Sequence, residues 1–160
     1  ATADSDRKVT PNWPYDSGIH EGPSYQATSR IGTHDGYDRW VLEFDEGSTP
    51  PTGWDIRWTG DSIENDGGGE DLDPTIHVDG NKYLTVRLKS SMGFFRTDGE
   101  MYWGPGDLYG SNVGASNLVH VSAWGEYEGY TLWAIGVEYE SEFNVGTLAD
   151  PARLVIDICH

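Results

Sequence analysis

The stretch "IGTHDGYDRWVLEFDEG", residues 31–47, begins with a polar turn whose residue types could do chemistry. His34, Asp35 and Asp38 belong to types that serve as general bases or metal ligands, and Arg39 follows them directly. Nucleophilic catalysis needs a nucleophile and an orienting partner, and neighbours on one turn rarely converge on a single substrate atom. We therefore favour a structural role, in which Asp35 and Asp38 hydrogen-bond the turn backbone and Arg39 pairs with a carboxylate on an adjacent strand.

A second candidate is the acidic loop "ENDGGGEDLDP", residues 64–74. Its three glycines allow the backbone to curl around an ion, and calcium takes about six to eight oxygen ligands, of which this loop supplies a part. The helix-loop-helix calcium template does not fit, because an aspartate stands where the turn glycine belongs. Two alternatives stay open: an acidic loop without an ion, which we favour, and a calcium site. The carboxylates that would hold calcium are Asp66, Glu70, Asp71 and Asp73.

Aromatic side chains are concentrated in residues 90–116, a stretch too irregular for regular structure and too aromatic for a disordered linker. Exposed Trp and Tyr rings suit a flat platform for sugar rings or for stems of a peptide. Trp124 and Trp133 could extend such a platform, although most of the rings are expected in the core. The candidate ligand-binding residues are Phe95, Tyr102, Trp103 and Tyr109.

Two further patterns have catalytic alternatives that we consider weaker. Paired carboxylates can hydrolyse glycosides, but among 27 acidic residues some pair always has a suitable spacing. The terminal "DICH" places Cys159 beside His160, which is only two residues and is interpreted as structural. We therefore expect no catalytic residue and no enzyme, with no cofactor other than the possible calcium ion.

Composition and charge exclude several classes of partner. The 160 residues contain 10 Lys and Arg against 27 Asp and Glu, a formal charge of −17, which repels nucleic acid and anionic lipid. No apolar run reaches the roughly 18 residues that span a bilayer. Cys159 is the only cysteine, which rules out an intramolecular disulfide and a Cys-rich zinc site. We expect one compact domain, monomeric and not membrane-spanning.

Alternating apolar residues indicate an all-β fold. Glycine is abundant at 21 residues, with 7 Trp and 9 Tyr, as expected for short aromatic strands joined by tight turns. We predict an antiparallel β-sandwich of about eight strands with long loops rather than a closed barrel. The predicted strands cover residues 24–34, 37–45, 54–60, 76–80, 82–90, 117–129, 130–143 and 152–158, and the fourth and fifth form a hairpin through Gly80 and Asn81.

The same alternation predicts which side chains are buried. We assign apolar residues of residues 54–58 and 82–90 to the core, and the polar ones between them to solvent. The polar residues expected outward are Asp55, Arg57, Lys82, Thr85, Arg87 and Lys89. Residues 1–23 show no sustained period and are expected to be a tail or linker that packs through Trp13 and Tyr15, so the domain is placed at residues 24–160.

Several motifs together resemble a known family. They are "HDGYDRWVLEF", "GWDIRW", "NDGGG", "HVDGNKYLTVRL" and "WAIGVEYESEFNVGTLADPARLVIDI". From Tyr25 to Ile158 this succession resembles the AMIN-like domain of actinobacterial secreted proteins and lipoproteins. The resemblance implies a β-sandwich that ends with a short strand, a Leu-x-Asp-Pro turn and a final strand. It implies no catalytic residues, and it implies localisation to the cell envelope through peptidoglycan or another wall polymer.

Our leading hypothesis is therefore a non-catalytic, extracytoplasmic binding or targeting domain, secreted or attached to the cell envelope, whose partner is a wall glycan or an envelope protein. The alternative is a structural or protein-interaction module at the cell surface that pairs an exposed strand edge with a partner. A glycan-active enzyme and a calcium-dependent sugar-binding module are less favoured alternatives.

Overall fold

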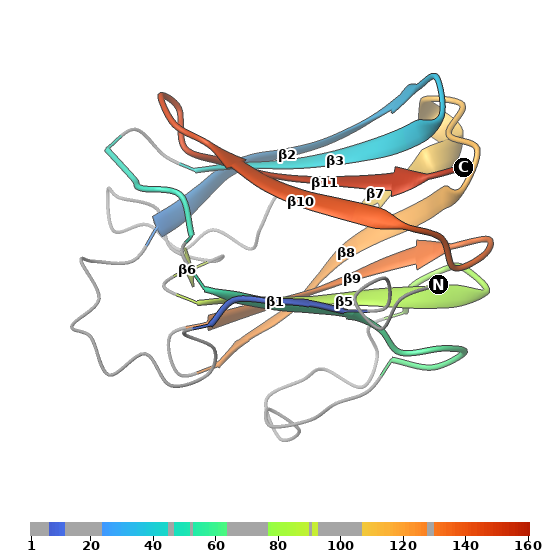
Figure 1. The fold of residues 1–160 in the computed structure, drawn as a ribbon, viewed down its shortest axis with the longest axis horizontal. Coiled ribbons are helices and arrows are strands. Elements are labelled where there is room, and N and C mark those ends of the chain that lie inside the picture. Colours follow the sequence, from blue (N-terminus) through green and yellow to red (C-terminus); the bar gives the residue numbers. More distant parts are fainter. Residues whose placement is uncertain are drawn as a thin grey trace.

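The computed structural model describes residues 7–11, 24–44, 47–51, 53–63, 77–89, 91–92, 107–127 and 130–160, with the backbone alone for 24–27, 91–92, 124–127 and 130. These residues form two sheets that face each other (Figure 1). The six-stranded sheet contains, in spatial order, β1 (Arg7–Val9), β4 (Trp54–Trp58), β5 (Lys82–Lys89), β9 (Tyr130–Val137), β8 (Leu118–Tyr127) and β7 (Leu108–Tyr109). The five-stranded sheet contains β10 (Phe143–Leu148), β11 (Arg153–Cys159), β3 (Tyr37–Phe44), β2 (Ser24–His34) and β6 (Ser91–Met92).

The predicted all-β sandwich is confirmed. Every pair of neighbouring strands is antiparallel except β2 and β6. Among the described residues, β1, β6 and β7 have only two or three residues, whereas the other strands have five or more. The short strand implied before the Leu-x-Asp-Pro turn is β10, and the turn itself contains a cis peptide bond between Asp150 and Pro151.

Inward-facing side chains of both sheets make one core. Trp40 on β3 and Trp133 on β9 meet between the sheets with their ring centroids 5.1 Å apart, and the Trp40 indole N–H donates to Ser29 Oγ at 2.6 Å. Period-two burial is regular on β11, where Leu154, Ile156 and Ile158 are fully buried. The predicted alternation therefore holds on the face of each sheet that meets the other.

The predicted strand over residues 76–80 is wrong where the structure describes it, because His77–Asp79 form no ladder. This segment lies against β9 so closely that a Cβ on Gly136 would be 1.8 Å from the Asp79 carbonyl oxygen. The Asp79 N–H donates to His120 Nδ1 at 2.8 Å instead of to a strand partner. The supposed hairpin is thus a loop that packs on the sheet, and β5 pairs with β4 and β9.

The outer face of the six-stranded sheet also differs from the prediction. Asp55, Thr85, Arg87 and Lys89 were expected to face water, yet all four are buried. Burial of Asp55 is possible because its carboxylate accepts hydrogen bonds from the guanidinium groups of Arg7 and Arg57, all at 3.0 Å. The ion pairs offset the free-energy cost of removing the Asp55 charge from water. The alternation rule assumes instead that a charged side chain avoids this cost by facing solvent.

β1 lies within the residues expected to form a tail. It pairs with β4 over Arg7–Val9, and the Thr10 N–H continues the pairing to the Trp54 carbonyl at 3.0 Å. Trp13 and Tyr15 lie outside the described residues. Within the described ranges, no helix has the length and apolar character needed to cross a membrane.

Candidate functional site

The polar turn between β2 and β3 joins the two sheets through Asp38. This side chain is fully buried, and its carboxylate accepts the backbone N–H groups of Asn117 at 2.7 Å and Leu118 at 2.9 Å, at the start of β8 in the opposite sheet. It also accepts the Ser116 N–H and the Thr33 hydroxyl. Asp38 was expected to bond the turn's own backbone, and that expectation is wrong because the side chain points inward between the sheets.

These hydrogen bonds control the charge of Asp38. Burial alone would raise the pKa of this carboxyl group, but the N–H groups of Leu118, Asn117 and Ser116 and the hydroxyl of Thr33 together lower its pKa below the ordinary value. His160 Nε2 lies 3.5 Å from the carboxylate and 3.1 Å from the His34 carbonyl oxygen. Asp38 is therefore a buried anion whose charge is stabilised by hydrogen bonds from the fold itself.

Asn117 completes this inter-sheet connection. Its side-chain carbonyl accepts the N–H groups of Glu138 at 3.0 Å and Tyr139 at 3.1 Å. Its amide donates to the carbonyl oxygens of Tyr139 and Cys159, at 3.0 and 3.2 Å. One buried side chain thus ties the start of β8 to the end of β9 and the end of β11.

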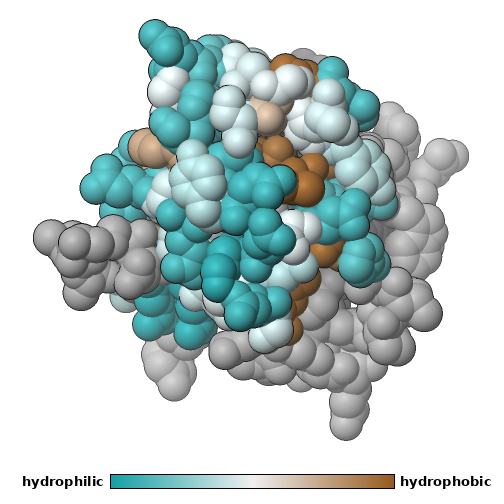
Figure 2. Space-filling view, turned by 90° about the vertical axis from the view of Figure 1, so that its right-hand side faces the viewer, coloured by the Kyte–Doolittle hydropathy of each residue, from teal (hydrophilic) through white to brown (hydrophobic). Residues whose placement is uncertain are grey.

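The rest of the turn supports the structural interpretation. Arg39 donates to both carboxylate oxygens of Asp157 on the adjacent β11, at 2.7 and 2.9 Å, as predicted. The His34 and Tyr37 rings stack with centroids 4.8 Å apart, and Asp35 is exposed. Figure 2 shows this end of the sandwich, whose described surface is mostly hydrophilic with small hydrophobic areas. The side chains of the turn hold strands together.

Most of the predicted ligand-binding residues lie outside the described part of the chain. These are the aromatic residues Phe95, Tyr102 and Trp103 and the carboxylates Asp66, Glu70, Asp71 and Asp73. Trp133 is buried and takes no part in a surface platform. Among the residues that are described, no group of His, Cys, Asp and Glu is arranged to hold a metal ion.

Tyr109 is described, and its ring is held in a fixed position. It is 39% exposed and stacks on His120 with ring centroids 4.5 Å apart. The buried His120 accepts the Asp79 N–H at Nδ1, so the proton of the neutral ring sits on Nε2, 3.2 Å from Asp107 Oδ1. The His120 ring serves as the support on which Tyr109 presents its other face.

The outer face of the five-stranded sheet carries two open hollows that share Arg39, Leu148 and Val155. One, of about 310 Å³, lies over β2 and β3, and the other, of about 270 Å³, lies over β10 and β11. Their lining combines arginine, aliphatic and glycine residues. The first hollow is lined by Arg30, Ile31, Gly32, His34, Arg39, Val41, Leu148, Arg153 and Val155, and the second by Arg39, Asn144, Val145, Gly146, Thr147, Leu148, Val155 and Asp157.

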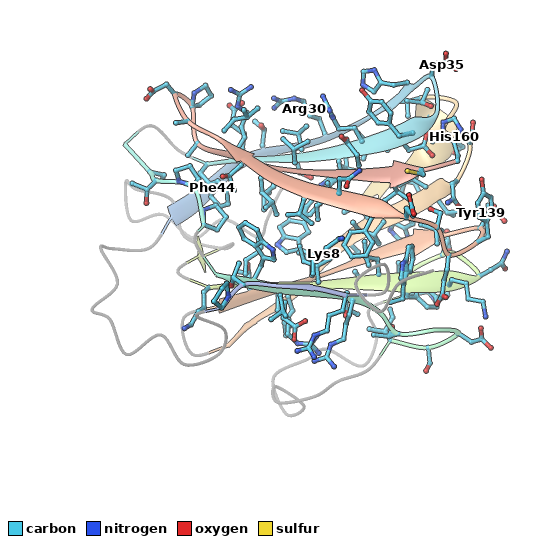
Figure 3. All side chains as sticks on the ribbon, viewed as in Figure 1. Lys8, Arg30, Asp35, Phe44, Tyr139 and His160 are labelled. Carbon is cyan, nitrogen blue, oxygen red and sulfur yellow. The ribbon has the colours of Figure 1, made fainter. Side chains whose placement is uncertain are left out.

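A third depression, of about 500 Å³, lies along one side of the sandwich between the edge strands β1 and β10. Its lining includes Trp54, Val145 and Lys8. Figure 3 shows Lys8 pointing from β1 into the space between the sheets, where its ammonium lies 5.8 Å from the centre of the Phe143 ring. This cation partly closes the open side of the sandwich.

Comparison with known protein families identifies the family of this chain. The AMIN-like domain model matches residues 26–160, which is most of the molecule. The chain belongs to the AMIN-like family. AMIN-like domains are generally non-catalytic and associated with the cell envelope, in agreement with the resemblance noted from the motifs. Among curated proteins and among solved structures, nothing matches this AMIN-like chain.

The hollowed outer face of the five-stranded sheet was not predicted from the sequence. Arg30, Arg39 and Arg153 come from three different strands, and only the register across β2, β3 and β11 brings them to one surface. A signal was present in the outward positions of β2 and β10, where Gly32 and Gly146 stand in place of larger side chains. A strand-interior glycine often marks a place where a ligand approaches closely.

Proposed function

We propose that this AMIN-like domain is a non-catalytic binding domain, acting outside the cytoplasm, that holds the protein carrying it at peptidoglycan or another polymer of the cell envelope. Family membership supports the envelope association. The observation that carries the proposal is the open, hollowed outer face of the β10–β11–β3–β2 sheet, over which an extended polymer can pass without entering an enclosed pocket.

Sedimentation with purified, insoluble peptidoglycan tests this function. The folded domain is expected in the pellet, with saturation as its concentration rises. The control is an unrelated β-protein of similar net charge. Anionic wall material repels a chain of formal charge −17, so the control shows how much protein is retained without specific recognition. If the domain stays in the supernatant with wall material from several bacterial sources, the proposed function is wrong.

Of the predicted aromatic ligand-binding residues, the structure describes Tyr109, so the predicted aromatic contact can be tested there. Tyr109 is held by His120 and exposes one ring face, a geometry suited to stacking on a sugar ring. We expect Tyr109→Ala to weaken retention on peptidoglycan by about tenfold, the loss of one stacking contact. Tyr139→Ala is the matched control, since this tyrosine is 47% exposed in the connection between β9 and β10.

A specific observation also favours the second candidate, a protein-interaction module. The Cys159 N–H bonds the Glu142 carbonyl, so the alternation of an antiparallel ladder turns the N–H groups of Val145 and Thr147 away from β11. An incoming strand could pair with this edge of β10, beside the depression lined by β1. Recovery of one envelope protein that Thr147→Pro abolishes, together with no retention on peptidoglycan, would favour this module instead.

A further inference from the structure

The outward-facing residues of the β10–β11–β3–β2 sheet form regular rows across the strands. Along each strand, side chains that point into the core alternate with side chains that point outward. The strand pairing places the outward residues Gly146, Val155, Val41 and Arg30 side by side in one row. The next row along the strands contains Leu148, Arg153, Glu43 and Thr28, and the row on the other side contains Asn144, Asp157, Arg39 and Gly32. Figure 3 shows Arg30 pointing away from the six-stranded sheet.

Gly32 and Gly146 make the hollows in this surface. Among the described residues, a Cβ built on Gly146 would meet nothing within 4 Å, and one on Gly32 would meet only His34 Nε2, at 3.9 Å. Neither glycine has a positive φ. Backbone conformation and packing therefore do not require glycine at either position, although a glycine inside a strand destabilises it by about 0.5–1 kcal/mol relative to alanine. What the two glycines provide is open space beside the arginines.

The charge of the surface is opposite to that of the whole chain. Three arginines, Arg30, Arg39 and Arg153, lie in the three rows against the two carboxylates of Glu43 and Asp157, whereas the chain as a whole has a formal charge of −17. Each guanidinium has several N–H donors in a planar fork that matches a carboxylate.

The arginines are also held in place while remaining accessible. The Arg30 side chain is 50% exposed, and its bonds to Thr28 and Glu43 are both made through Nη1, at 3.3 Å. Arg39 is 37% exposed and fixed by its two bonds to Asp157, made through Nε and Nη2. Both side chains are thus positioned before a ligand arrives and keep further N–H groups for it.

The floor of the hollows is apolar. Val41 and Val155 sit between the arginines, and Leu148 is 49% exposed at the border shared by the two hollows. A carboxylate on a carbon that carries a small alkyl group satisfies both parts of this surface, because its charge meets a guanidinium and its methyl enters a hollow. A phosphodiester-linked polyol offers the charge without the alkyl group.

We propose that the face formed by Arg30, Arg39 and Arg153 around the hollows at Gly32 and Gly146 binds carboxylates that carry a small apolar group, of the kind presented by the peptide stems of peptidoglycan. This inference rests on the proposed wall-binding function and adds the chemical group that is recognised. The glycines keep the hollows open, and the arginines provide the charge.

The test uses insoluble peptidoglycan treated with hydrofluoric acid, which removes phosphodiester-linked polymers, and a portion whose carboxyl groups have then been amidated with a carbodiimide and an amine. The whole 160-residue chain should bind the first material and lose at least about tenfold in affinity for the second. Gly32→Val and Gly146→Val should each cause a similar loss while keeping or raising the melting temperature, because valine favours a strand.

Two matched variants control for size and charge. Gly146→Ala leaves most of the hollow open and should bind within about twofold of the native chain. Arg30→Gln and Arg153→Gln should weaken binding several-fold, whereas Lys82→Gln, which removes a positive charge from the other sheet, should not. Circular dichroism verifies the fold of each variant, and the two glycine variants keep the test valid even if an arginine variant is unstable.

The outcomes separate failure of this inference from failure of the proposed function. Retention of the native chain, unchanged in all the glycine and arginine variants, would overturn the site while wall binding stands. Binding that disappears after hydrofluoric acid treatment, or that survives amidation of the carboxyl groups, would overturn the ligand class. Absence of binding to every wall preparation would overturn the proposed function, and this inference with it.

Discussion

Asp38 shows how one carboxylate can join two sheets. It is fully buried on β3, yet all of its backbone donors belong to the segment that opens β8 in the other sheet. A buried charge is tolerated only where several donors replace the water it has lost. The sequence neighbours of Asp38 therefore say little about its role, which depends on a segment almost eighty residues further along the chain.

We predict that Asp38→Asn lowers the free energy of unfolding by about 2–4 kcal/mol at pH 7, because the new amide directs N–H donors at the N–H groups of Asn117 and Leu118. The folded pKa of Asp38 is lowered, so its stabilisation is complete above the unfolded pKa of about 3.9 and is lost as pH falls through the lower folded pKa. Urea denaturation at pH 7 and about pH 3 should show the difference between the two proteins shrinking on acidification. A difference that stays constant over this range would contradict the role of the ionised carboxylate.

Asn117 makes a second prediction at the same end of the sandwich. Asn117→Ala leaves the N–H groups of Glu138 and Tyr139 without their side-chain acceptor, so we expect a loss of about 2–4 kcal/mol in unfolding free energy. Asn112→Ala, at an exposed position of the short 3-10 turn Gly110–Asn112, is the control and should change stability little. Equal melting temperatures for the two variants would mean that the buried amide network contributes nothing to stability.

At the level of elements, the pairing of β1 with β4 depends on an ion pair. Arg7→Ala removes two of the hydrogen bonds to the buried carboxylate of Asp55, which still retains Arg57. We expect unfolding to become easier by about 1–3 kcal/mol and the Thr10 amide, which bonds the Trp54 carbonyl, to exchange its hydrogen faster. Val9→Ala is the control, since this side chain is 45% exposed and its loss should change stability by no more than about 0.5 kcal/mol. Unchanged exchange at Thr10 in Arg7→Ala would show that the ladder, and not the ion pair, holds β1.

Period-two patterning was sufficient to predict the strands that form the core. β3 and β11 alternate because one face of each packs against the opposite sheet, and the predicted sandwich follows from that alternation. The alternation rule failed on the outer face of the six-stranded sheet, where polar side chains are buried as well. Arg87 and Lys89 satisfy the polar half of the pattern, but partners in the fold allow them to be buried.

The candidate binding face was less predictable than the fold, for a geometric reason. Arg30 and Arg153 lie far apart in the sequence. They come to one face only because β11 pairs with β3 in one particular register. A shift of that register by one residue would turn Arg153 and Val155 inward. Register across non-consecutive strands cannot be read from local spacing, whereas glycine at outward strand positions can be recognised there.

On the scale of the whole molecule, the formal charge of −17 predicts a dependence on salt. Compact folding brings like charges closer together, and raising ionic strength from about 0.01 M to 0.15 M shortens the screening length from about 30 to 8 Å. We expect the melting temperature to rise by several degrees over this range of NaCl, as measured by calorimetry. A melting temperature that falls would show that attractive ion pairs, such as Arg39 with Asp157, outweigh the repulsion.

Calcium chloride at matched ionic strength serves as a second comparison in the same experiment. If the acidic loop at residues 64–74 binds calcium, the melting temperature should rise above the value in NaCl and return when a chelator is added. Equal melting temperatures in the two salts at millimolar calcium would contradict the calcium hypothesis.

The position of β11 has a consequence for how the chain matures. This strand follows the other described strands in the sequence but lies between β10 and β3, so it joins the two parts of its sheet. During synthesis on a ribosome, the five-stranded sheet lacks its connecting member until residues 153–159 have emerged. A nascent chain interrupted before Arg153 would therefore be unable to complete the five-stranded sheet and close the sandwich.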